Sequence, residues 1–361
     1  GVKQVFNTIN MADTVIHEDC STEAPLTLFS ELASDAGKSV GVVSTARITH
    51  ATGAAVYAKT ANRNWESEAP EGCVDIATQL VDQMEAGVID VAFGGGARAF
   101  APEGTEIEVG TGNRTDGVNL IDRATEIGAQ VVYNSEQLAS ADMSAPVLGL
   151  FTNSDMNYEY DRPEGEPSLA DMTTAAIEAL QGNEEGFYLM VEAGRVDHAN
   201  HGGNAHRAFT DGVAFAEAVA AAQEMVDLEN TLIIVTADHE HVINFNGYCG
   251  RGTPITGVCM DIASGQVEHS GEPVTAADGK PYTVVTYANG AGSVLVEQTD
   301  GTYSGSRPDL TQEEAMDPDY LQQALLPMGS ETHSGVDVAL WATGPWAHLF
   351  GGTMDQEMIF H

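Results

Sequence analysis

Residues 37–52 read GKSVGVVSTARITHAT, an apolar run that passes directly into a polar loop. The valine-rich part, residues 39–44, predicts a buried β-strand. His50 and Thr52 follow shortly after the end of that strand. Ligands of open α/β sheets bind at the carboxyl ends of strands. The stretch therefore predicts one strand of an α/β sheet followed by candidate binding residues.

Other segments extend this pattern along the chain. Apolar, β-branched runs predict further strands at residues 88–93, 130–133, 146–151, 187–191, 231–236 and 336–342. Helical spacing of apolar residues predicts helices at residues 26–36, 74–86, 168–180 and 206–226. Gly37 and Gly87 follow two of these helices as C-caps, and Ser168 with Asp171 forms a capping-box pattern. The alternation predicts an α/β fold with a largely parallel sheet.

The composition is strongly acidic. The 361 residues carry 54 Asp and Glu against 14 Lys and Arg, a formal net charge of -40. This charge argues against binding to nucleic acids, which requires basic residues, and against anionic membrane surfaces. The apolar fraction of 43% is too high for a disordered acidic tail. No run of 18 apolar residues predicts a spanning helix, and no signal-peptide pattern is present.

The acidity favours adaptation to high salt. Self-repulsion at this charge opposes the compact state, and salt relieves it by shortening the Debye length to about 3 Å at 1 M. An acidic protein without salt adaptation is the alternative interpretation. The dependence of stability on salt concentration separates the two.

Residues 249–329 differ from the rest of the chain because they are rich in Gly, Pro, Asp and Thr. We interpret them as an insertion between two core strands within a single domain over residues 1–361. Cys249 and Cys259 bracket a short loop that a disulfide could close, and Cys20 and Cys73 could form a second one. Free buried thiols are the alternative. Disulfides would indicate an oxidising compartment.

The sequence VEAGRVDHANH at residues 191–201 contains the strongest cluster of polar side chains. An apolar strand leads to Glu192, followed by Asp197, His198 and His201. Asp197 and His201 are four residues apart and face the same way on a helix, a natural arrangement for two zinc ligands. A solvated polar turn is the alternative for this cluster taken alone.

Two further clusters of polar side chains lie next to predicted strands, one after a strand and one before a strand. VTADHEH at residues 235–241 places Asp238, His239 and His241 after an apolar run, and ETHSG at residues 331–335 places His333 before another. A histidine satisfied in the core would explain one of these residues but hardly all of them. The donors Asp197, His201, His333, Asp238 and His239 together suit two zinc ions, a recurrent device for phosphoryl transfer.

The loop after the first strand adds groups for a harder cation and for phosphate. The hydroxyl of Thr52 suits Mg²⁺. Arg63 can bind two phosphate oxygens in a bidentate manner, although a surface ion pair would also explain it. The run GGGAR at residues 94–98 lacks the Lys and Ser/Thr of a P-loop, so we interpret it as a tight turn.

These motifs resemble those of the alkaline phosphatases. VEAGRVDHANH, TADHEH, ETHSGVDVA and the HAT segment followed by Arg63 have the family's order and spacing over essentially the whole chain. GKSVGVVSTARITHAT and RNWESEA are especially similar to the animal-type and marine bacterial branch. The resemblance implies a three-layer α/β/α fold, a crown-like region corresponding to residues 249–329, and metal-dependent hydrolysis of phosphate monoesters.

The resemblance also implies roles for individual residues. Asp197, His201 and His333 match ligands of the first zinc, and Asp238 and His239 match ligands of the second. Glu192 and Thr52 match ligands of a third site that usually holds magnesium, on which His50 acts through water. Arg63 and His198 match residues that bind phosphate, His198 through water. His241 matches a residue that orients a zinc ligand.

The resemblance to the alkaline phosphatases also bears on the pairing of the cysteines and on a calcium site. Cys20 and Cys73 match a disulfide of the animal-type enzymes, whereas Cys249 and Cys259 have no counterpart that we recognise. Tyr158, Glu159 and Asp171 lie near the positions of a calcium site in animal members, which the resemblance leaves open. It further implies a homodimer, and export to the periplasm or outside the cell.

One departure concerns the nucleophile. The family uses a Ser in a D-S-A-type stretch, with a metal-binding Asp further upstream, and neither has a counterpart among these residues. Nothing marks Ser44 as an activated substitute. We therefore expect the 361 residues to be an interior segment of a longer protein and to be inactive alone.

Two alternative functions are kept. A phosphodiesterase or sulfatase of the same superfamily would share the metal core, although Arg63, Glu192 and Thr52 together favour a monoesterase. A non-catalytic, acidic cation-binding protein is supported by the missing nucleophile. Mono- against diester turnover tests the first alternative, and metal stoichiometry tests the second.

Overall fold

A computed structural model describes residues 1–361, which form two compact units. The sheet unit comprises Gly1–Arg195, Val213–Ile234 and Ala342–His361. The histidine unit comprises Val196–Gly212 and Val235–Trp341. The predicted insertion, residues 249–329, lies within the histidine unit. No helix of the chain is both long and apolar enough to cross a membrane.

The sheet unit is built on five parallel strands in the order β5-β6-β2-β1-β7. Their near-continuous apolar sequences suit a sheet that is covered on both faces. Each coincides with a predicted strand, which confirms the parallel α/β fold. The strands are β1 (Ser39–Arg47), β2 (Val91–Gly95), β5 (Gln130–Val132), β6 (Val147–Leu150) and β7 (Phe187–Glu192).

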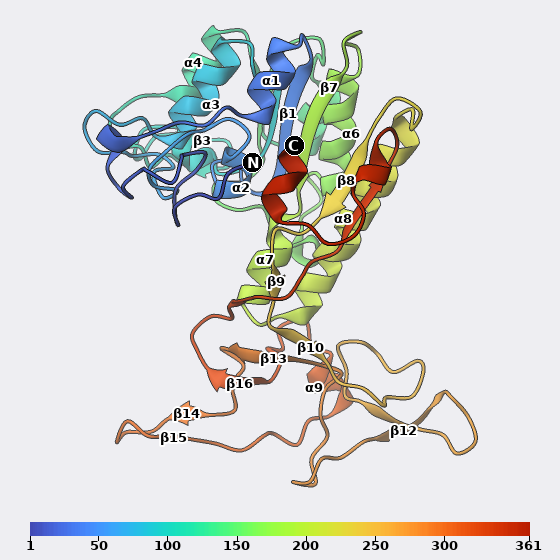
Figure 1. Cartoon of the computed structure of the whole chain (residues 1–361). Coiled ribbons are helices and arrows are strands. Elements are labelled where there is room, and N and C mark those ends of the chain that lie inside the picture. The colour runs from blue at the N-terminus through green and yellow to red at the C-terminus, as the bar shows by residue number, and fades with distance from the viewer. The chain divides into compact units, whose positions relative to one another are not determined.

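Helices cover both faces of this sheet, as Figure 1 shows for α3 and α6. Side chains of a strand alternate between faces, so Val40 and Val42 of β1 pack on one side and Val43 on the other. The first side contacts α1 (Phe29–Asp35), α3 (Ile76–Glu85) and α4 (Leu120–Glu126). The second side contacts α5 (Ser135–Ser140), α6 (Leu169–Leu180) and α8 (Ala205–Met225). The sheet unit therefore has three layers.

Local sequence signals set the ends of these helices. Ser168 and Asp171 close the predicted capping box of α6, and Asp75 caps α3 by accepting from the Thr78 amide. Gly37 and Gly87 have φ of 79° and 70°, the left-handed conformation expected of C-caps.

The remaining elements are shorter. The sheet unit also has α2 (Ala51–Ala54), β3 (Glu106–Ile107) and β4 (Gly110–Thr111), and α7 (Gly194–His201) begins there. The elements that follow in the chain are β8 (Ile233–Thr236), β9 (Glu240–His241), β10 (Ile243–Phe245), β11 (Met260–Ile262), β12 (His269–Pro273), β13 (Val285–Gly290), β14 (Val296–Glu297), β15 (Tyr303–Ser304), α9 (Gln312–Ala315), β16 (Ala324–Pro327), β17 (His333–Ser334) and β18 (Leu340–Thr343). Short 3-10 helices lie at Cys20–Thr22, Ala97–Phe100, Glu159–Asp161, Ala347–Leu349 and Gln356–Phe360.

Two predicted core strands differ from expectation. Residues 231–236 and 336–342 contain β8 and β18, which pair with each other instead of joining the five-stranded sheet. Neither strand has a fully buried residue. An apolar run predicts an extended conformation, but it does not specify which strand becomes its partner.

Both predicted disulfides are formed. Cys20 is bonded to Cys73 in the sheet unit and Cys249 to Cys259 in the histidine unit, and no cysteine is free. The first bridge lies beside a small core of Met11, Val15, Ala61 and Trp65. The alternative of free buried thiols is therefore wrong.

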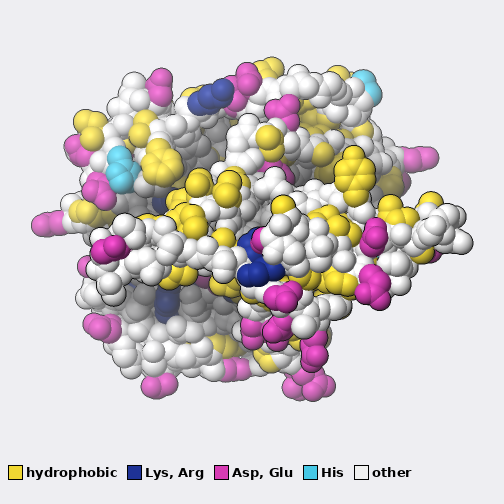
Figure 2. Space-filling view, turned by 90° about the horizontal axis from the view of Figure 1, so that it is seen from below, with side chains coloured by type: hydrophobic (Ala, Val, Ile, Leu, Met, Phe, Trp, Pro, Cys, Tyr) yellow, Lys and Arg dark blue, Asp and Glu magenta, His cyan; other side chains and the backbone are white.

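Acidic side chains are spread over the surface. Figure 2 shows Asp and Glu at many places on one face, with Lys and Arg at few. This distribution agrees with the net charge of -40.

The last residue of β2, Gly95, is enclosed by backbone. A Cβ there would lie 2.1 Å from the Ser154 carbonyl oxygen and 3.1 Å from the Met156 amide nitrogen. We expect Gly95→Ala to lower the free energy of unfolding by about 3 kcal/mol, because the closest overlapping atom belongs to the main chain and Thr152 Oγ1 also lies within 2.6 Å. Exposed Gly182 has open space around it, so Gly182→Ala is the control. Urea unfolding measures both, and equal stabilities would contradict the prediction.

Candidate metal centre

Three segments of the histidine unit bring the predicted ligands together. Asp197 and His201 lie on α7 and share one face of the helix. Strands β9 and β17 pair antiparallel, with His241 directly opposite His333. This register explains how residues 92 positions apart in the chain become neighbours.

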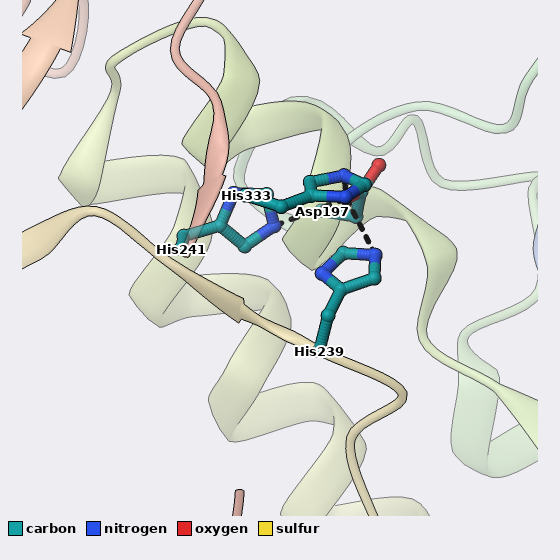
Figure 3. Close-up of side chains that lie close together, drawn as sticks. All are labelled: Asp197, His239, His241 and His333. Carbon is teal, nitrogen blue, oxygen red and sulfur yellow. Dashed lines mark ion pairs between the residues drawn. The ribbon is translucent and has the colours of Figure 1, made fainter. Parts of the chain in front are cut away.

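The imidazoles surround one carboxylate oxygen. Asp197 Oδ1 lies 3.0 Å from His241 Nε2, 3.4 Å from His201 Nε2, 3.5 Å from His333 Nε2 and 3.8 Å from His239 Nε2. Figure 3 shows the side chains of Asp197, His239, His241 and His333 pointing toward one another. Possible ligand atoms of these four residues all lie within 4.8 Å of one another. One carboxylate with several imidazoles is a donor set that suits zinc.

The hydrogen bond between His201 and Glu331 supports this fit. Its Nδ1 lies 2.7 Å from the Glu331 carbonyl oxygen. A carbonyl can only accept, so Nδ1 carries the proton and a neutral ring has a bare Nε2. That Nε2 faces Asp197 Oδ1 and lies 3.1 Å from His333 Nε2. A lone pair directed at a carboxylate oxygen is unfavourable without a cation, so these residues fit a metal ion.

The cluster also shifts the pKa values of its members. Burial opposes ionisation of Asp197, but the imidazoles of His241 and His201 beside its carboxylate hold its pKa well below the usual value. Burial opposes protonation of His241, yet the neighbouring carboxylates of Asp197 and Glu331 raise its pKa. Burial and the charge of His239 lower the pKa of His333. The site therefore keeps a negative carboxylate beside imidazoles at neutral pH.

Two other predicted residues of this unit lie beside the cluster. Asp238 Oδ2 is 3.2 Å from His239 Nε2, and its side chain is 63% exposed. His198 follows Asp197 on α7, and its charge contributes to the lowered pKa of Asp197.

The sheet unit contains the other predicted residues. Glu192 ends β7 opposite Ser44 of β1, and Ser44 Oγ donates to Glu192 Oε2 at 2.5 Å. His50 is the N-cap residue of α2, and its Nε2 lies 3.0 Å from an Arg63 guanidinium nitrogen. Thr52 is exposed on the same helix. Glu192 is thus the last residue of β7, and His50, Thr52 and Arg63 come after the end of β1 in the chain.

An ion-pair network that sequence reasoning missed fixes this edge of the sheet. Arg47, the last residue of β1, donates two bonds of 2.8 Å to Glu66 and one of 2.8 Å to Asp155. Thr49 also donates to Glu66, at 2.6 Å. Burial favours the neutral form of Glu66. The hydrogen bonds from Arg47 and Thr49 outweigh this effect, so the pKa of Glu66 lies below its usual value. The network holds the segment that contains Arg63 against β1.

Acidic residues at the calcium position already have protein partners. Glu159 forms an ion pair of 2.8 Å with Arg162, and Asp171 closes the capping box of α6. The structure therefore adds no support for a calcium site there.

Comparison with known proteins identifies the family. The family model described as alkaline phosphatase matches residues 1–361. This chain belongs to the alkaline phosphatase family. It is 37% identical to the alkaline phosphatase of Gadus morhua, covering 100% of this chain and 76% of that protein. It is 38% identical to the tissue-nonspecific isozyme of Gallus gallus, covering 100% and 70%.

Solved alkaline phosphatases share the fold. The cold-active enzyme from a psychrophilic Shewanella species matches with a TM-score of 0.62 and 21% identity, over 99% of this chain and 80% of that one. The Thermus thermophilus enzyme matches with a TM-score of 0.57 and 32% identity, over 69% of this chain and 48% of that one. A variant of the enzyme from the Antarctic bacterium TAB5, with Mg bound in its M3 site, has a TM-score of 0.58 and 19% identity, over 95% of this chain and 74% of that one. Family membership supports hydrolysis of phosphate monoesters by a metal-dependent enzyme.

Proposed function

We propose that this protein hydrolyses small phosphate monoesters through a phosphoseryl intermediate, using two zinc ions and one magnesium ion. The observation that supports this most directly is the convergence of Asp197, His201, His239 and His333 within the histidine unit. In this proposal Asp197, His201 and His333 hold the first zinc, and Asp238 and His239 hold the second.

In the sheet unit, Glu192 and Thr52 would hold magnesium, with His50 acting through water. When bound, the three ions would lower the pKa of the attacking oxygens and offset negative charge on the transferring phosphoryl group. The bond from Ser44 to Glu192 supports a role for Glu192 as an oriented carboxylate.

The chain's own residues bind and orient the phosphate. Arg63 would bind two phosphate oxygens, and the nearby His50 imidazole limits where its guanidinium can point. His198 would bind phosphate through water. His241 would orient Asp197, from which it lies 3.0 Å. Ser44 is fully buried and donates to Glu192, so it does not serve as the nucleophile. We keep the prediction that residues 1–361 alone are inactive.

Hydrolysis of p-nitrophenyl phosphate at alkaline pH in high salt tests the proposal. We expect the full-length protein to turn over this substrate, to lose nearly all activity with a chelator, and to regain it with zinc plus magnesium. Activity that survives complete metal removal would contradict the metal centre. Faster turnover of bis-p-nitrophenyl phosphate or of a sulfate ester would favour the phosphodiesterase or sulfatase alternative. Many weakly bound ions without turnover would favour the cation-binding alternative.

Salt adaptation has its own test. We expect the midpoint of thermal unfolding to rise steadily between 0.1 and 2 M KCl, because the Debye length falls from about 10 Å to about 3 Å or less. Sucrose at matched osmolality is the control, because it stabilises by exclusion without screening charge. A midpoint that KCl leaves unchanged, or raises no more than sucrose does, would contradict adaptation to salt.

Export to an oxidising compartment is supported by the two disulfides. We also keep the homodimer as a proposal, which sedimentation velocity at high salt tests directly.

A further inference from the structure

Glu331 is a buried acid that sequence reasoning left without a role. It lies two residues before His333, and its side chain is 0% exposed. Its position between β16 and β17 places it beside both α7 and β9, the two elements that carry other members of the cluster.

Both its main chain and its side chain bond to histidines of the cluster. The carbonyl oxygen accepts from His201 Nδ1 at 2.7 Å, and the amide donates to the His201 carbonyl at 2.9 Å. Carboxylate Oε2 accepts from His241 Nδ1 at 2.7 Å, and Oε1 accepts from the Val242 amide at 2.6 Å. The amide, the carbonyl oxygen and both carboxylate oxygens of Glu331 therefore each form a hydrogen bond.

These bonds fix where the protons lie on two imidazoles. His201 must donate from Nδ1, because a carbonyl only accepts. The carboxylate oxygen of Glu331 that faces His241 likewise accepts, which favours Nδ1–H on His241. The Nε2 atoms of both rings then face Asp197 Oδ1, at 3.4 and 3.0 Å. One residue thus orients two rings toward the same point.

Glu331 also affects Tyr287, to which it is not hydrogen-bonded. Burial, together with the negative charge of Glu331, raises the pKa of Tyr287, whose hydroxyl donates to Asn200 on α7. A buried carboxylate is costly unless its oxygens are hydrogen-bonded, and here a backbone amide and an imidazole supply those bonds. Hydrogen bonds of this kind, made by residues that do not touch the metal, orient the side chains that surround it.

We propose that Glu331 is a positioning residue of the metal centre, which fixes His201 through its carbonyl and His241 through its carboxylate. The inference rests on the proposed zinc site in the histidine unit. It adds that loss of the carboxylate weakens zinc binding although Glu331 itself does not touch the metal.

The test replaces Glu331 with glutamine in the full-length protein. Glutamine has one oxygen for two donors, so either His241 or Val242 faces an amide N–H. We expect the zinc dissociation constant, measured by competition with a chromophoric chelator, to rise 10- to 100-fold. We also expect the visible d–d spectrum of the Co²⁺-substituted protein to change. Glu297→Gln, at an exposed acid of β14, is the matched control and should change neither.

A second measurement needs no variant and stands if Glu331→Gln fails to fold. Nitrogen-15 labelling of histidine, with long-range NMR correlations in the zinc-loaded protein, reports which ring nitrogen carries the proton. We expect Nδ1–H at His201 and His241. A bare Nδ1 at either ring, or a folded Glu331→Gln variant with unchanged zinc affinity and Co²⁺ spectrum, would overturn the proposal. Retention of zinc by Asp197→Asn would instead contradict the metal centre itself.

Discussion

Replacing Asp197 with asparagine is expected to reduce kcat/KM for p-nitrophenyl phosphate by about 10³-fold or more. The change keeps the shape of the side chain but removes the charge on which four imidazoles converge. Metal ions supply several kcal/mol of transition-state stabilisation, and each 1.4 kcal/mol is a tenfold change in rate. We expect zinc content, measured by atomic absorption, to fall in parallel.

Asp309→Asn is the matched control, because Asp309 is an exposed acid of the same unit. It should retain normal turnover and zinc content. If Asp197→Asn kept activity within tenfold of the unaltered protein together with its full zinc content, Asp197 would not be a zinc ligand.

Replacing Arg114 with methionine is expected to lower the free energy of unfolding by about 3–5 kcal/mol. The Arg114 side chain is 1% exposed and forms two 3.0 Å bonds with Asp75, the N-cap residue of α3. It also bonds to the Ala99 carbonyl and to Asp116. Methionine leaves the largely buried carboxylate of Asp75 without its cation, which is the costly part of the change.

Two further variants make this prediction specific. Arg114→Lys should be intermediate, because an ammonium group cannot form the paired bonds to Asp75. Arg123→Ala removes exposed pairs with Asp82 and Glu85 and should cost at most about 1 kcal/mol. Urea unfolding measures all three. If Arg114→Met and Arg123→Ala lowered the free energy of unfolding equally, burial of the Arg114–Asp75 ion pair would not explain its contribution to stability.

Much of the fold could be predicted because its signals are local. Valine-rich runs predicted the five parallel strands, and Gly37, Gly87 and Ser168 marked helix ends that the structure confirms. The partners of β8 and β18 could not be predicted, because strand pairing depends on contacts between distant segments.

The convergence of the candidate ligands could also be predicted, because Asp197 and His201 have helical spacing and the other histidines cluster near strand ends. The role of Glu331 was not. An acid two residues before a histidine is an ordinary surface pattern, and only the pairing of β9 with β17 buries it against His241. Arg47 and Glu66 were missed for the same reason, since their contact joins residues 19 positions apart.

The sequence by itself determined the family, the α/β class and the residue types available for metal chemistry, because these depend on composition, periodicity and motif order. Only the tertiary structure decided which atoms meet. The direction of each imidazole, the burial of Glu331 and the bond between Ser44 and Glu192 arise from strand register and packing. Hydrogen bonds and ion pairs act over a few ångströms, and side chains far apart in the sequence reach that range only when the chain folds.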